Sequence, residues 1–130
     1  MVSQKNKILL VEDDKDLLPM YKEYLEDEGY ILTIAKDGNR GITEIKKGGF
    51  DIILLDIMMP NTDGLQVLQS LTPTDKAKNG PIIMLSQLND EPVMKKALRY
   101  GASGYIIKSS LGLPDLLHEV RVYLNKDQTK

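Results

Sequence analysis

The chain has 130 residues, of which 42% are hydrophobic and 28% are charged, and it contains no cysteine. This length predicts one domain with enough apolar side chains for an ordinary core, and the absence of cysteine excludes disulfides, zinc–thiolate sites and iron–sulfur clusters. Because 17 basic and 19 acidic residues give a formal net charge of −2, no basic field favours binding to nucleic acid or to anionic lipid.

Short β-type runs recur along the chain and alternate with helical segments. The expected strands are Lys7–Val11, Tyr30–Ala35, Asp51–Leu55, Ile82–Leu85 and Gly104–Ile107. Three of them are nearly continuous runs of Ile, Leu and Val, which is typical of strands that are covered on both faces in a parallel sheet.

A segment with helical spacing or helix-boundary residues follows each run. The expected helices are one with apolar positions at Leu17, Leu18, Tyr21 and Leu25, a second over Gly41–Lys47, a third over Leu65–Leu71, a fourth from Asn89 or Asp90 to Gly101, and a fifth that begins at Pro114. Thr72–Gly80 is expected to be the one long polar loop. Five β-then-α units predict parallel strands joined by right-handed crossovers, and hence a three-layer α/β sandwich. We expect the domain to cover residues 1–124 and residues 125–130 to form a short polar tail.

The apolar runs are too short to cross a membrane, which takes about 20 residues. The apolar run Ile8–Val11 is followed by the charged residue Glu12, and the run Ile52–Leu55 is followed by Asp56. The polar start Met1–Lys7 also lacks the apolar stretch of a signal peptide. The sequence therefore predicts a cytoplasmic protein without membrane contact.

Polar side chains follow four of the expected strands. They are Glu12, Asp13 and Asp14 after the first strand, Asp56 after the third, Ser86 after the fourth and Lys108 after the fifth. In open parallel sheets, ligands bind beyond the carboxyl ends of the strands, so these side chains are expected to converge at one edge. Carboxylates on strands about 5 Å apart repel each other unless a cation compensates them.

These residue types suit magnesium-assisted phosphoryl transfer onto Asp56. Mg²⁺ prefers carboxylate and phosphoryl oxygens, and a carboxylate can act as a nucleophile to form an aspartyl phosphate. Lys108 can neutralise Asp56 or a bound phosphoryl group, and Ser86 can donate a hydrogen bond to it. Each residue alone fits a structural role, and we assign helix capping to Asp14 and Asp16 rather than to Asp13. Their convergence, not any single residue, carries the hypothesis.

From about Lys5 to Leu124, the chain resembles the receiver domain of two-component response regulators. Lys7–Val11 with the acidic residues after it resembles the opening strand and acidic pair of that family, and Leu54–Pro60 followed by Asp63–Gly64 resembles its phosphoacceptor segment. Ser86 and Lys108 stand at the Ser/Thr and lysine positions of the family, and Tyr105 stands at its aromatic switch position.

The resemblance implies a flavodoxin-like (βα)₅ fold with strand order 2-1-3-4-5, an order for which a member of this family is a standard example. It implies that Asp13 and Asp56 bind Mg²⁺ directly, Met58 through its backbone carbonyl and Glu12 through water. Asp56 would accept a phosphoryl group from a phosphohistidine of a sensor histidine kinase or a histidine phosphotransferase. Ser86 and Tyr105 would then reorient and remodel the surface around the fourth helix, the fifth strand and the fifth helix.

The same resemblance implies a stand-alone signalling switch rather than an enzyme with its own metabolite, since a receiver catalyses only its own phosphorylation and dephosphorylation. The output would pass to an unidentified downstream protein by protein–protein contact, without nucleic acid. Many DNA-binding relatives carry an acidic residue for dimer salt bridges where Ser103 stands here, so we expect a monomer or a weak dimer.

Two departures from the family pattern keep an alternative open. Ser109 follows Lys108 where the family usually has proline, and Gln87 follows Ser86 where it commonly has a small residue. The alternative is an unphosphorylated pseudo-receiver that serves as a binding scaffold. A weaker alternative is an aspartate-nucleophile phosphatase, but such enzymes need a second Asp where this chain has Met58.

Overall fold

The computed structural model describes residues 6–87, 89–108 and 112–128. Its elements are, in chain order, β1 (Lys7–Val11), α1 (Leu17–Asp27), β2 (Ile31–Ala35), α2 (Gly38–Lys47), β3 (Ile52–Asp56), α3 (Gly64–Gln69), α4 (Pro73–Ala77), β4 (Ile82–Ser86), α5 (Glu91–Arg99), β5 (Gly104–Ile107) and α6 (Leu113–Gln128). The predicted alternation of strands and helices is confirmed.

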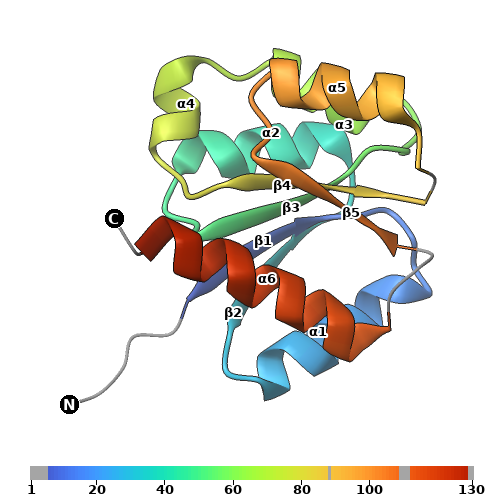
Figure 1. The fold of residues 1–130 in the computed structure, drawn as a ribbon, viewed down its shortest axis with the longest axis vertical. Helices are drawn as coiled ribbons and strands as arrows, with labels where there is room; N and C mark the ends of the chain where they lie inside the picture. The colour runs from blue at the N-terminus through green and yellow to red at the C-terminus, as the bar shows by residue number, and fades with distance from the viewer. Residues whose placement is uncertain (1–5, 88, 109–111, 129–130) are drawn as a thin grey trace.

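The strands form one parallel sheet in the order β2-β1-β3-β4-β5. Figure 1 shows α2, α3 and α5 over one face of this sheet, with α4 beside α2, and α1 and α6 over the other face. The predicted three-layer sandwich and its strand order are therefore confirmed. Among the described residues, no helix combines the length and apolar character that a membrane crossing requires.

Two apolar cores flank the central strands because successive side chains of a strand point to opposite faces. Leu9, Ile53 and Met84 belong to the core under α2, α3 and α5. Ile8, Leu10, Ile52, Leu54, Ile83 and Leu85 belong to the core under α1 and α6. Complete burial of one such side chain contributes about 1.5–3 kcal/mol, so the central strands form a rigid base for the residues at their ends.

The prediction of a loop over Thr72–Gly80 is wrong, because this segment contains the short helix α4. Thr72 caps that helix by accepting a hydrogen bond from the Asp75 amide, and the Asp75 carboxylate accepts one from the Thr72 amide. Pro73 occupies the first turn, where its missing N–H costs nothing. The last helix also differs from expectation, since α6 continues through Gln128 into the segment expected to be a tail.

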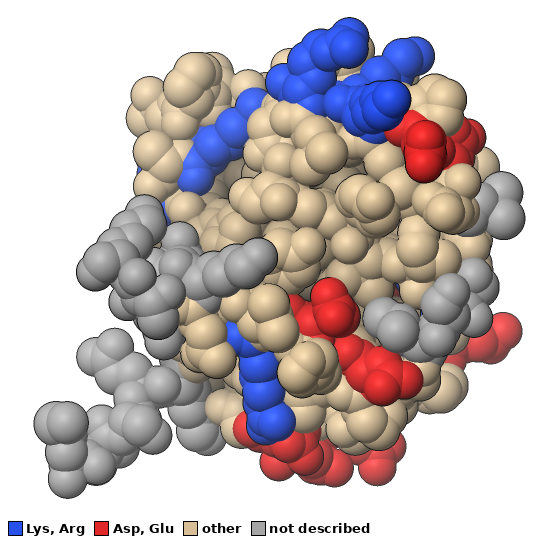
Figure 2. Space-filling view, viewed as in Figure 1, with Lys and Arg blue, Asp and Glu red and all other residues tan. Residues whose placement is uncertain are grey.

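Charged side chains form two groups on the face of the molecule that carries α5, β5 and α6 (Figure 2). Figure 2 shows Lys and Arg along the α5 edge of this face with acidic side chains at one end of them, Asp and Glu near α6 with a basic side chain beside them, and mostly uncharged surface between the two groups. Lys95, Lys96 and Arg99 are the exposed basic residues of α5, and Asp115 is exposed on α6. Leu98 and Tyr105, on α5 and β5, are exposed large side chains of this face.

Candidate functional site

The parallel register brings the predicted site residues to one edge of the sheet. Glu12 follows β1 directly, and Asp56 and Ser86 are the last residues of β3 and β4. The register pairs Asp56 with Leu85 and Ser86 with Ile107, the residue before Lys108. Glu12, Asp56 and Ser86 are all buried, so the predicted convergence is confirmed.

Lys108 is the cation that faces the carboxylates, and its side chain is only 7% exposed. Its Nζ donates a hydrogen bond to Glu12 Oε1 at 2.7 Å and lies 3.5 Å from Asp56 Oδ1. The other carboxylate oxygen of Glu12 accepts a hydrogen bond from the Asp14 amide. In this state Lys108 is therefore held mainly by Glu12, and only loosely by Asp56.

Asp56 has an unsatisfied oxygen in the middle of the site. Its Oδ1 is buried and accepts no hydrogen bond from any described residue. Burial, assisted by the nearby charge of Glu12, raises the pKa of Asp56 to about 7, although the charge of Lys108 acts in the opposite direction. Burial also acts to lower the pKa of Lys108, but the hydrogen bond to Glu12 and the charge of Asp56 outweigh it, so that pKa lies above its usual value.

Carboxylate oxygens of Glu12, Asp13 and Asp56 all lie within 4.8 Å of one another. Hard oxygen ligands are the donors that Mg²⁺ prefers, and the unsatisfied oxygen of Asp56 is available to such an ion. Among the described residues at this edge, the three carboxylates face a single ammonium group, so a divalent cation would also correct the charge. The residues thus fit the predicted Mg²⁺ site.

Neighbouring acidic residues have a structural role. Asp14 Oδ1 accepts hydrogen bonds from the amides of Asp16 and Leu17 at the start of α1, which confirms its predicted capping role. Asp16 occupies the cap position but accepts no side-chain cap bond, so the same prediction for Asp16 is wrong. An N-cap side chain accepts from the second or third residue of the helix, but here the Leu18 amide donates to the Asp14 backbone carbonyl and Pro19 has no N–H.

The remaining predicted residues lie around this cluster. The side chain of Met58 is 71% exposed, and Tyr105 is 40% exposed on the edge strand β5. Gly64, the first residue of α3, packs directly against the end of β3. A Cβ atom at this position would lie only 2.5 Å from the Asp56 carbonyl oxygen, so the close packing requires glycine. The roles assigned to Met58, Ser86 and Tyr105 remain predictions, and the Lys108–Ser109 peptide bond lies outside the described residues.

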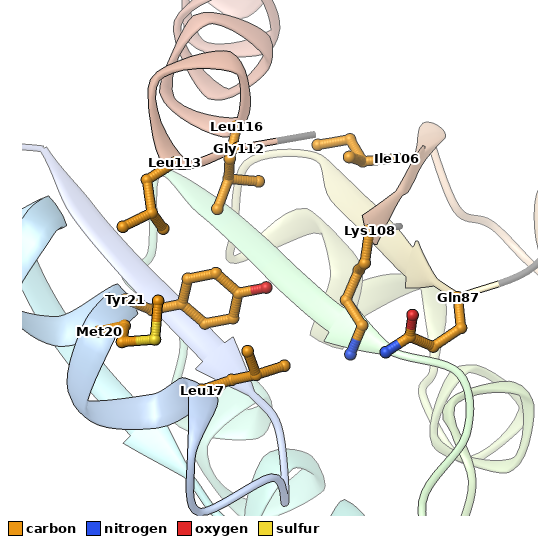
Figure 3. A pocket seen from close by; sticks show the side chains of 9 residues that line it. All are labelled: Leu17, Met20, Tyr21, Gln87, Ile106, Lys108, Gly112, Leu113 and Leu116. Atoms are coloured by element: carbon orange, nitrogen blue, oxygen red, sulfur yellow. The ribbon is translucent and has the colours of Figure 1, made fainter. Parts of the chain in front are cut away.

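A pocket of about 290 Å³ opens beside Lys108, between α1 and α6 (Figure 3). Its lining consists of Leu17, Met20, Tyr21, Gln87, Ile106, Lys108, Gly112, Leu113 and Leu116. The sequence predicted Tyr21 only as part of the apolar face of the first helix. Among the apolar positions of that face, Tyr21 alone carries a hydroxyl group, and it lies one helical turn after Leu17. This hydroxyl group is the signal that could have pointed to a role for Tyr21 at the site.

The model of the response regulator receiver domain matches residues 8–121 of this chain. The chain belongs to this family. It is therefore a receiver domain of two-component signalling, a class of phosphorylation-dependent switches.

Individual relatives agree with this assignment. The chain is 35% identical over 127 residues to the uncharacterized transcriptional regulatory protein YkoG of Bacillus subtilis, covering 98% of this chain and 54% of that protein. It is 33% identical over 124 residues to the response regulator ArlR of Staphylococcus saprophyticus, covering 95% and 54%. This receiver domain thus spans about half the length of these curated relatives.

Solved structures match over nearly their whole length. A CheY-like receiver domain protein from Methanospirillum hungatei superposes with a TM-score of 0.84 at 28% identity, covering 96% of this chain and 98% of that chain. The chemotaxis protein CheY4 of Vibrio cholerae superposes with a TM-score of 0.83 at 26% identity, covering 92% and 99%. The fold and the family assignment therefore agree.

Proposed function

We propose that Asp56 of this receiver domain accepts a phosphoryl group from a phosphohistidine, in a reaction that depends on Mg²⁺. The donor would be a sensor histidine kinase or a histidine phosphotransferase. The observation that carries this proposal is the buried, unsatisfied Asp56 Oδ1, 3.5 Å from the Lys108 ammonium and within a cluster of three carboxylates. A buried oxygen without a partner costs stability, so a ligand that satisfies it is the simplest reason for its place.

The transfer step needs only a nucleophile and groups that balance charge. A carboxylate oxygen of ionised Asp56 attacks phosphorus, an O–P bond forms, and the P–N bond to the histidine breaks. The electron pair of that bond stays on the imidazole nitrogen, which then takes up a proton. Lys108 lies close enough to balance charge on the phosphoryl oxygens, and Ser86, at the end of the next strand, would donate a hydrogen bond to one of them.

Glu12, Asp13 and Asp56 would hold the Mg²⁺ ion, with Met58 contributing its backbone carbonyl. When bound, Mg²⁺ supplies positive charge that offsets the carboxylates and polarises a phosphoryl oxygen. Burial raises the pKa of Asp56 to about 7 in the protein alone. Positive charge beside Asp56 favours its ionised, nucleophilic form.

Phosphorylation would change the partner of Lys108. A phosphoryl group adds about −1.5 to −2 charges and three acceptor oxygens, which attract the ammonium away from Glu12. Ser86 would turn toward the phosphoryl group and Tyr105 would follow, so that the surface around α5, β5 and α6 changes. That face has two groups of charged side chains, near α5 and near α6, with mostly uncharged surface between them (Figure 2), and it carries exposed Leu98 on α5 and Tyr105 on β5, which suits contact with a downstream protein.

Intact-mass analysis tests the acceptor. The protein and an Asp56→Asn control are each incubated with Mg²⁺ and acetyl phosphate, with and without a chelator. We expect one phosphoryl group on the wild-type protein, and none on Asp56→Asn or in the chelated sample. If the wild type takes up no phosphoryl group while a known receiver is modified in parallel, the proposal is wrong and the scaffold alternative is favoured.

A further inference from the structure

The pocket beside Lys108 contains a hydroxyl group for which the phosphorylation chemistry has no role so far. Tyr21 is 9% exposed, and its ring belongs to the apolar core under α1 and α6. Its hydroxyl group extends out of that core into the pocket and points toward the end of Lys108 (Figure 3). Apart from the ends of Tyr21, Lys108 and Gln87, the side chains that line the pocket are apolar.

Lys108 has hydrogen-bonding capacity directed at this pocket. An ammonium group has three N–H donors, and the short bond to Glu12 uses one of them. Burial raises the pKa of Tyr21, while the charge of Lys108 acts to lower it and the charges of Glu12 and Asp56 act to raise it. The hydroxyl group is therefore neutral at neutral pH and lies within the electrostatic reach of all three site residues.

We propose that the Tyr21 hydroxyl group positions the Lys108 ammonium for phosphorylation of Asp56. It accepts a hydrogen bond from Lys108 through one water in the resting protein, and directly when the amine moves from Glu12 toward a phosphoryl group. A pocket of about 290 Å³ has ample room for that water. This inference rests on the proposed function of Asp56.

A neutral acceptor fits this task better than a third carboxylate would. When Lys108 leaves Glu12, it gives up a charge-assisted hydrogen bond of 2.7 Å. An acidic side chain in the place of Tyr21 would compete with the phosphoryl group for the ammonium charge. A hydroxyl group replaces part of the lost bond and leaves the charge free to act on the phosphoryl oxygens.

Kinetics of the Tyr21→Phe variant test the proposal, because this change removes the hydroxyl group and keeps the ring. Tyr24→Phe is the matched control, since Tyr24 is also on α1 and packs against the same core, but does not line this pocket. With acetyl phosphate and Mg²⁺, we expect Tyr21→Phe to lower the maximal rate of phosphorylation about three- to tenfold, with the half-saturating donor concentration unchanged. Tyr24→Phe should leave both values unchanged, and equal rates for all three proteins would overturn the proposal.

A second measurement does not depend on phosphorylation. The NMR resonance of Lys108 Nζ, recorded in the resting protein, reports the hydrogen bonds of the ammonium group. Tyr21→Phe should shift this resonance, whereas Tyr24→Phe should not, and an unchanged resonance in Tyr21→Phe would contradict the contact. If the wild type takes up no phosphoryl group, the proposed function of Asp56 fails, while this comparison still decides whether Tyr21 contacts Lys108.

Discussion

Two buried aspartates at opposite ends of the sheet have opposite electrostatic environments. Asp75, in α4, is 7% exposed, and its Oδ2 accepts hydrogen bonds from Lys46 Nζ at 2.8 Å and from the Thr72 amide at 2.9 Å. The bond from Lys46, followed by the contribution of Thr72, lowers the pKa of Asp75 to about 2. Asp56 is 2% exposed, and burial raises its pKa to about 7. Figure 1 shows α4 at one end of the sheet and the carboxyl ends of the strands at the other.

The difference shows that burial alone does not mark a functional carboxylate. Asp75 has partners for its charge, and the bond to Thr72 comes from three residues away in the chain. Asp56 has an oxygen without a hydrogen bond from any described residue, and its charged neighbours, Glu12 and Lys108, directly follow other strands, β1 and β5. An aspartate whose bonds are complete stabilises the fold, whereas an aspartate whose bonds are incomplete is available for a ligand.

The largest expected effect on stability follows from removing Lys108, the cation beside Asp56. Lys108→Met leaves Glu12 and Asp56 buried without a compensating charge and should lower the free energy of unfolding by about 3 kcal/mol in the absence of Mg²⁺. Lys46→Met is the control, because Lys46 is 45% exposed and its ion pair with Asp75 should contribute at most about 1 kcal/mol. Urea denaturation at neutral pH measures the free energy of unfolding of both variants. Equal decreases in the two variants would show that the environments of Asp56 and Asp75 do not differ in this way.

Magnesium should stabilise the Asp56 end in particular. At an Mg²⁺ concentration of 100 times its Kd, binding to the folded state raises the free energy of unfolding by about 2.7 kcal/mol. Asp13→Asn and Asp56→Asn should lose most of this gain, because each removes a charged ligand, whereas Glu23→Gln on the exposed face of α1 should keep it. Thermal unfolding with and without the metal provides the measurement, and an equal gain in all four proteins would exclude these carboxylates as the site.

The smallest expected effect concerns Asp75 and depends on pH. Because the pKa of Asp75 is lowered from 3.8 to about 2, its ionised form stabilises the folded state fully above about pH 4. This contribution disappears as the pH falls through about 2. The difference in Tm between the wild type and Asp75→Asn should therefore be greatest above pH 4 and close toward pH 2. A difference that stays constant over this range would show that the charge of Asp75 does not contribute.

The sequence predicted the parts of the fold that depend on composition and spacing. The run of Ile and Leu at Ile52–Leu55 predicted a strand buried on both faces. The order of such runs along the chain also predicted which polar residues meet at the sheet edge. Helix α4 was missed because its five residues are too few to show an amphipathic face. Thr72 and Asp75, three residues apart with Pro73 directly after Thr72, have the spacing of a capping box, and this is the signal that could have pointed to the helix.

The sequence predicted which residues form the site better than it predicted which of them make hydrogen bonds and ion pairs with one another. Lys108 was expected to neutralise Asp56 or a phosphoryl group, whereas its short hydrogen bond is to Glu12. That choice depends on where the lysine side chain can reach after β1, β3 and β5 are in register. Tyr21 was missed for a similar reason, since an amphipathic pattern assigns a residue to the core but does not show where its hydroxyl group points.

The bond between Lys108 and Glu12 joins residues 96 positions apart, close to the two ends of the domain. During synthesis, Glu12 is made 96 residues before Lys108, so a growing chain that stops short of Lys108 lacks the complete site. Lys108 directly follows β5, which lies at the sheet edge and, among the described strands, pairs with β4 alone, so β5 can join the sheet only after β4 is in place. The site therefore forms only after the sheet has been completed through β5, so the presence of the Glu12–Lys108 bond reports that folding has reached this edge strand.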